Sequence, residues 1–97
     1  MYEVEKTEEF DAWLDNIKDG KTNKVIVKRI RKMSLGTLGE VKSLGSGLFE
    51  AKIRYGAGFR LYFVNKGKRI IVLLCGGDKS TQQEEIKQAR KMIKEEL

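Results

Sequence analysis

Basic residues in the second half of the chain have the types and spacing needed to stabilise a phosphate group. Lys52 and Arg54 alternate with apolar residues in one segment, and Arg60 and Tyr62 do so in the next. Two such segments joined by a Gly-Ala-Gly turn predict a β-hairpin with these four side chains on one outward, charged face. Lys79 follows a Gly-Gly pair just before a predicted helix, where a phosphate could bind. Cations in this arrangement could stabilise the charge that develops when a ribose 2′-hydroxyl attacks a phosphate.

The same cations also have a purely structural interpretation. Lys52 and Arg54 could be ordinary solvent-facing side chains. Their partners would then be Glu50 or Asp78, and such surface ion pairs contribute little. Arg60 lies beside a tight turn among aromatic residues, where it could form an ion pair between strands. The sequence leaves both interpretations open.

The composition limits the possible chemistry. The 97 residues include 20 Lys and Arg against 14 Asp and Glu, a net charge of +6, which favours a polyanionic partner without requiring one. There is no histidine, so histidine-dependent nucleophiles and histidine-ligated metal sites are excluded. Any catalysis must therefore use Lys, Arg, Tyr or carboxylate side chains.

The length and the apolar segments predict one domain over residues 1–97. The single cysteine, Cys75, lies in an apolar segment and is expected to be a buried structural thiol. No apolar run is long enough to cross a bilayer, and the glutamate-rich N-terminus does not resemble a signal peptide. We expect a soluble, unprocessed, cytoplasmic protein.

A short strand at residues 1–5 and a helix are expected first. Thr7, followed by two glutamates, is typical of a helix N-cap, and Gly20 is placed to end this helix. The helix has an apolar stripe at the spacing that one buried face requires. The stripe consists of Phe10, Trp13, Leu14 and Ile17.

A second helix is expected to run to about Ser34, capped by Thr22 or Asn23. Its predicted inward residues are Ile26, Ile30 and Met33. Lys24, Lys28 and Arg31 form a basic stripe on another face. This stripe is either a solvated surface or a contact for nucleic acid or a partner.

The remaining segments complete the predicted fold. Residues 35–47, with four glycines, are expected to form an ordered loop. Strands at 49–55, 59–64 and 70–75 follow, and the last, which has no polar residue, should be covered on both faces at the centre of the sheet. A capping box at 80–83 predicts a final helix. Its expected buried stripe is Ile86, Ala89, Ile93 and Leu97.

This order of elements, with LFEAKIRYGAGFRLYF from Leu48 and LLCGGDKS from Leu73, resembles the RelE/ParE toxin superfamily. It is most similar to the HigB-like branch, also described as phage-derived Gp49-like or addiction-module killer proteins. The resemblance covers essentially the whole chain. It implies an α+β fold of order β-α-α-β-β-β-α, in which a helical hairpin and a C-terminal helix pack on a small, mainly antiparallel sheet.

The resemblance also implies a function. The protein would be the toxin of a type II toxin–antitoxin system, a ribosome-dependent mRNA endoribonuclease that needs no metal or cofactor. Its partners would be mRNA on the ribosome and an antitoxin, of helix-turn-helix type, encoded beside it. A ParE-like inhibitor of DNA gyrase, or a non-catalytic module that binds the antitoxin, are the alternatives.

Matching the motifs residue by residue gives the candidate site. RelE-type toxins also use a tyrosine in the final helix, whereas residues 82–85 here are Gln-Gln-Glu-Glu. The match falls on Lys52, Arg54, Arg60 and Lys79, and of these Arg54, Arg60 and Lys79 are the candidate catalytic residues. The candidate substrate-binding residues are Lys52, together with Tyr62 from the same strand face and Lys28 and Arg31 from the basic helix stripe.

Overall fold

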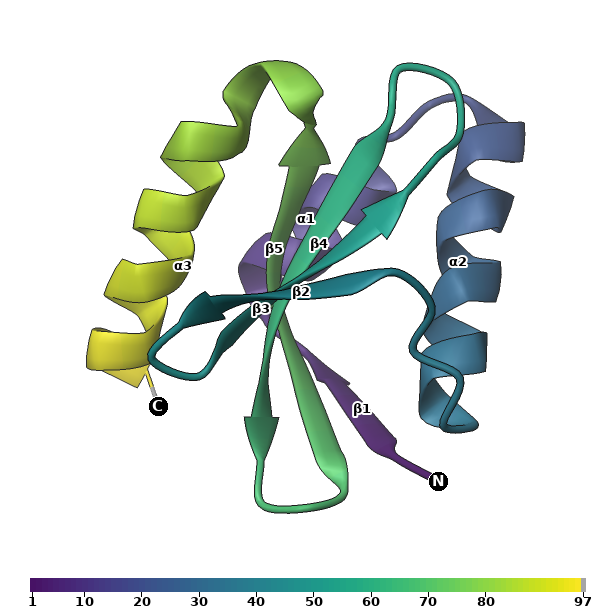
Figure 1. The fold of residues 1–97 in the computed structure, drawn as a ribbon. Coiled ribbons are helices and arrows are strands. Elements are labelled where there is room, and N and C mark those ends of the chain that lie inside the picture. Colours follow the sequence, from purple (N-terminus) through teal and green to yellow (C-terminus); the bar gives the residue numbers. More distant parts are fainter. Residues whose placement is uncertain (97) are drawn as a thin grey trace.

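Five strands form a single sheet with helices on both faces (Figure 1). The computed structural model describes residues 1–96. The strands lie in the order β1-β5-β4-β3-β2, and β1 is parallel to β5 whereas the other neighbours are antiparallel. The strands are β1 (Glu3–Lys6), β2 (Val41–Gly45), β3 (Leu48–Ile53), β4 (Phe59–Lys66) and β5 (Ile70–Asp78). The helices are α1 (Glu8–Asp15), α2 (Gly20–Ser34) and α3 (Gln82–Glu96), with a 3₁₀ turn, η1 (Lys79–Thr81), before α3.

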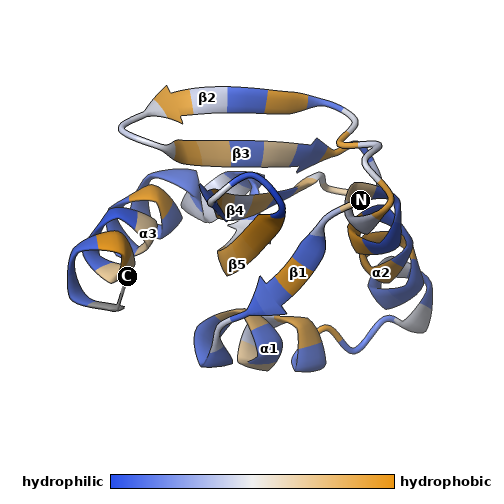
Figure 2. Ribbon diagram, turned by 90° about the horizontal axis from the view of Figure 1, so that it is seen from below, coloured by the Kyte–Doolittle hydropathy of each residue, from blue (hydrophilic) through white to orange (hydrophobic). Residues whose placement is uncertain are grey.

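The sheet separates two apolar cores. Helices α1 and α2 cover one face and α3 covers the other (Figure 2). Successive residues of a strand point to opposite faces, so Phe63 belongs to the first core and Tyr62 to the second. The predicted α+β architecture is confirmed. No helix within residues 1–96 is both long and apolar enough to cross a membrane.

The first helix begins as predicted. The Thr7 side chain accepts a hydrogen bond from the Phe10 amide at 3.1 Å, which satisfies one of the free N–H groups at the helix start. The same hydroxyl donates to the Leu74 carbonyl at 2.6 Å. Thr7 therefore fixes α1 directly to β5, and Phe10 and Leu14 are buried as expected.

The junction between the two helices differs from the prediction. Helix α1 already ends at Asp15, and Gly20 is the first residue of α2 rather than the end of α1. Asp19 is the N-cap of α2: its carboxylate accepts from the Lys21 amide at 3.2 Å and from the Thr22 hydroxyl at 2.7 Å. The predicted N-caps, Thr22 and Asn23, lie inside the helix because Asp19 already caps α2 three residues before Thr22.

The glycine-rich segment at 35–47 contains a strand that the sequence did not predict. Strand β2 pairs with β3 and forms one edge of the sheet. Its two partly buried apolar residues are three positions apart, because a bulge interrupts the register, so the alternation typical of a strand is missing. Gly45, Ser46 and Gly47 all have positive φ and form the tight turn into β3.

The C-terminal half needs two smaller corrections. Strand β5 is covered on both faces as predicted, but β4 occupies the centre of the sheet. The turn into α3 is capped by Asp78, which accepts from the Ser80 amide at 2.9 Å, so the predicted capping box is not formed. Ala89 and Met92 are the buried residues of α3; Leu97 lies outside the described residues.

The strand face predicted to be outward is largely covered by α3. Tyr62 is fully buried and Arg60 is 7% exposed. The alternating pattern correctly predicted which strand residues share a face of the sheet. The expectation that Arg60 and Tyr62 point into solvent was wrong. A second apolar core under α3 explains this difference.

Candidate functional site

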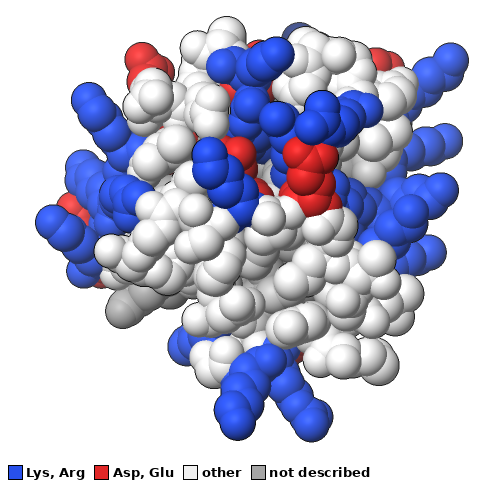
Figure 3. Space-filling view, viewed as in Figure 1, with Lys and Arg blue, Asp and Glu red and all other residues white. Residues whose placement is uncertain are grey.

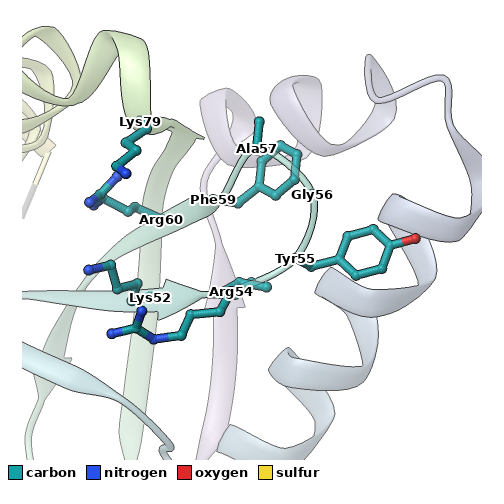
Figure 4. A pocket seen from close by; sticks show the side chains of 10 residues that line it. Lys52, Arg54, Tyr55, Gly56, Ala57, Phe59, Arg60 and Lys79 are labelled. Carbon is teal, nitrogen blue, oxygen red and sulfur yellow. The ribbon is translucent and has the colours of Figure 1, made fainter.

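Four of the six basic candidate residues line one hollow. Lys52, Arg54, Arg60 and Lys79 surround a space of about 330 Å³ where β3 ends and β4 begins, together with the turn at 55–59. Lys52 lies directly opposite Arg60 in the β3–β4 register. Their side chains extend to one side of the hairpin, whereas Tyr55 points the other way (Figure 4). We call this space the cation hollow.

Arg60 belongs to a buried network. Its Nε lies 3.5 Å from Glu50 Oε1, and the two side chains are only 8% and 6% exposed. Gln82, the first residue of α3, donates from Nε2 to the other Glu50 oxygen at 2.9 Å. This is the inter-strand ion pair that the sequence left open. Although Arg60 Nε forms no hydrogen bond among the described residues, the pair lies at the edge of the cation hollow, which Arg60 lines.

Arg54 is paired quite differently. Its Nε and Nη2 donate to the two carboxylate oxygens of Glu40 at 2.8 and 3.1 Å, and both side chains are exposed. The hydrogen bonds from Arg54 hold the pKa of the Glu40 carboxyl below its ordinary value. The partner is therefore neither of the carboxylates that the sequence suggested.

Lys52 and Lys79 are the cations of the hollow that remain available. Neither forms a salt bridge within the described part of the chain. Asp78, next to Lys79, instead accepts from the Ser80 amide and hydroxyl, at 2.9 and 2.6 Å. These hydrogen bonds lower the pKa of Asp78, and they direct its carboxylate into the turn.

Tyr62 does not line the cation hollow. Its hydroxyl is buried without a hydrogen-bond partner among the described residues, and burial raises its pKa. Burial also raises the pKa of the neighbouring Cys75 thiol, to about 12. In this conformation neither group offers a substrate contact or an accessible proton acceptor.

Lys28 and Arg31 lie apart from the other candidates. With Asn23, Lys24 and Val27 they line a separate hollow of about 280 Å³ on α2. Figure 3 shows basic side chains projecting from the side of the molecule where α2 lies. The structure therefore separates these two candidates from the cation hollow.

Arg29 is an important residue that the sequence analysis missed. It donates four hydrogen bonds to three backbone carbonyls: to Leu38 at 2.8 and 3.1 Å, to Glu40 at 3.0 Å and to Lys52 at 2.6 Å. Gly39, with φ of 74°, lies directly against its guanidinium, where a Cβ would collide. Arg29 thus joins α2 to the loop and strand beside the cation hollow. Its position within an arginine- and lysine-rich helix gave no signal of this.

The Gly-Gly pair before Lys79 has a packing role. A Cβ on Gly76 would collide with the Trp13 ring, and one on Gly77 with the Glu85 carboxylate. The missing side chains of the two glycines would lie on opposite faces of β5. Their absence lets α1 pack closely on one face and α3 on the other. Trp13 also packs against Phe59 beside the hollow. The glycines therefore allow close approach of the helices that surround the site.

The fold and the hollow together define a small α+β protein with a cation-lined site suited to an anion. The family described as "Phage derived protein Gp49-like (DUF891)" matches residues 9–95. An uncharacterized protein of Haemophilus influenzae is 40% identical over 93 residues, which cover 96% of this chain and 94% of that protein. The chain belongs to the Gp49-like family, which confirms that part of the resemblance.

Proposed function

We propose that this protein is the toxin of a type II toxin–antitoxin system, a HigB-like member of the RelE/ParE superfamily that cleaves mRNA on the ribosome. Membership of the Gp49-like family supports the toxin role at a coarse level. The cation hollow carries the finer proposal, because four cations from β3, the turn after it, β4 and η1 converge there. Activity on ribosomes would place the protein in the cytoplasm.

In the proposed chemistry these cations contact the phosphate in different ways. Lys52 and Lys79, which have no carboxylate partner among the described residues, would contact the scissile phosphate directly. Arg60 would face the same phosphate from a fixed position set by Glu50. Together they would stabilise the charge on the phosphorane as the 2′-hydroxyl attacks. The proton acceptor would be a group of the substrate or of the ribosome, because the Lys52 ammonium that supplies charge to the phosphate cannot also accept a proton.

The test compares two lysine pairs. Lys52→Ala with Lys79→Ala should lower mRNA cleavage in a translating extract by about 10²-fold or more, because both removed charges face the hollow. The matched control, Lys66→Ala with Lys68→Ala, removes two exposed lysines at the turn between β4 and β5 and should leave cleavage unchanged. Lys52 is half-buried and the other three lysines are exposed. A surface substitution shifts stability by about 0.5 kcal/mol or less at each site, so both variants should stay folded.

The same extract experiment separates the competing functions. Purified protein is assayed in parallel for inhibition of gyrase supercoiling. Supercoiling inhibition without cleavage would replace this proposal with the ParE-like function. Absence of both activities would leave only a binding module. Equal cleavage by the two lysine variants would show that the hollow is not the active site.

The proposed partner is an adjacent antitoxin of the helix-turn-helix type. An acidic or apolar segment of it would cover the cation hollow or block ribosome entry, and the net charge of +6 would speed encounter at low salt. Co-expression of the neighbouring gene should rescue growth and co-purify with tagged toxin. A neighbour that does neither would contradict the toxin–antitoxin assignment.

A further inference from the structure

The exposed carboxylate of Glu40 occupies the donor groups through which Arg54 would bind a phosphate. Two parallel N–H donors of a guanidinium fit the two oxygens of a carboxylate or of a phosphodiester equally well. In this structure the Nε–Nη2 edge of Arg54 points to Glu40, with distances of 2.8 and 3.1 Å. Arg54 lines the cation hollow, and Glu40 lines the adjoining one, which shares Lys52 and Arg60 with it.

The fold holds Glu40 in this position through its backbone. Its carbonyl accepts from Arg29 at 3.0 Å and from the Lys52 amide at 3.0 Å. Gly39, directly before it, adopts the left-handed backbone conformation under the Arg29 guanidinium. Because these contacts involve main-chain atoms, the Glu40 side chain can leave Arg54 without any change in the loop.

The two arginine pairs of the site differ in how easily they can be opened. The Arg54 and Glu40 side chains are 72% and 49% exposed, and water and salt weaken such a pair. The Arg60–Glu50 pair is less than a tenth exposed, so separating it would leave a charge in a buried site. Only the Arg54 pair is therefore suited to exchange its partner for an incoming anion.

We propose that Glu40 is a built-in competitor that a substrate phosphate displaces from the Nε–Nη2 edge of Arg54. The identity of the anion as a phosphodiester rests on the proposed function. The contact then acts as an autoinhibitory device: it keeps Arg54 neutralised until a phosphate that also meets Lys52 and Lys79 enters the hollow. An anion that lacks those additional contacts gains less from displacing Glu40.

The experiment measures binding of a labelled single-stranded RNA dodecamer to the full chain at low salt. Glu40→Gln should tighten binding about two- to fivefold, the range expected from removing one exposed ion pair. The matched control is Glu3→Gln, which makes the same charge change beside Ile70, at the opposite end of β5 from the hollow. It should tighten binding less than Glu40→Gln. In an Arg54→Gln background, Glu40→Gln should give no more than the control.

Each outcome decides the proposal. Equal effects of Glu40→Gln and Glu3→Gln, persistence of the Glu40 effect without Arg54, or no RNA binding by any variant would each overturn it. Cleavage in a translating extract is measured separately with the parent protein. If the parent cleaves mRNA but Glu40→Gln does not tighten binding, only the competitor role fails. If Glu40→Gln tightens binding but the parent does not cleave, the proposed function fails and the anion competition stands.

Discussion

Replacing Arg60 alone should destabilise the protein as well as alter its site. The Glu50 carboxylate, 6% exposed, would lose the cation that lies 3.5 Å from it. At this separation the attraction is about 5 kcal/mol for an effective dielectric constant of about 20, and breaking one side of a buried pair costs about 3 to 5 kcal/mol. A domain of this size has a free energy of unfolding of about 5 to 15 kcal/mol. Arg60→Met should therefore lose a large part of its stability.

Removing both charges should restore most of that loss. In Glu50→Gln with Arg60→Met, no buried charge remains, and the amide at position 50 can still accept from Gln82. Replacing a buried ion pair with uncharged residues often leaves stability unchanged. We therefore expect the free energy of unfolding of the double variant to lie within about 1 kcal/mol of that of the parent. Urea denaturation of the parent, both single variants and the double variant gives the complete cycle.

Two results would refute this reasoning. Arg60→Met as stable as the parent would show that Glu50 is not a buried charge held by Arg60. A double variant as unstable as Arg60→Met would show that the loss comes from packing. The stable double variant then allows a clean activity test, since absent mRNA cleavage would reflect the missing guanidinium rather than unfolding.

Three further predictions concern the frame of the site. Gly76→Ala should lower the free energy of unfolding by about 1 to 3 kcal/mol, because the new methyl group would collide with the rigid Trp13 ring. Gly77→Ala should lower it less, because the new methyl group would meet the flexible end of the Glu85 side chain. Equal urea midpoints for the two variants would contradict this prediction. Arg29→Lys should lower the free energy of unfolding by about 2 kcal/mol, because an ammonium cannot make the four hydrogen bonds that the guanidinium donates to the three carbonyls. An unchanged urea midpoint would show that these hydrogen bonds do not stabilise the fold. Burial raises the pKa of Glu85, so the folded state holds its proton more tightly than the unfolded chain and its charge destabilises the fold above that raised pKa. Glu85→Gln should therefore raise Tm at neutral pH, and its advantage should disappear as the pH falls through the raised pKa towards the ordinary value; a Tm gain that does not change with pH would exclude this cause.

The sequence by itself determined the local elements and the separation of the strand faces. The alternation around Lys52, Arg54 and Arg60 placed them on one face of a hairpin, and the structure brings them together with Lys79. The cap at Thr7 and the buried face of α1 at Phe10 and Leu14 were also predicted correctly, although Ile17 of the predicted stripe lies beyond the end of the helix. These features depend on periodicity and on single side chains that bond to nearby backbone, so the residue order is sufficient to predict them.

Tertiary contacts decided everything that depends on a partner distant in sequence. Packing of α3 on the sheet buries Tyr62 and encloses Arg60 with Glu50, and no local pattern indicates which face of a strand a later helix will cover. Strand β2 has weak alternation and exists through its pairing with β3. The sequence supplies the four cations, but which of them are neutralised depends on where the fold places Glu40 and Glu50, because an ion pair requires a distance of a few ångströms that only the folded chain sets.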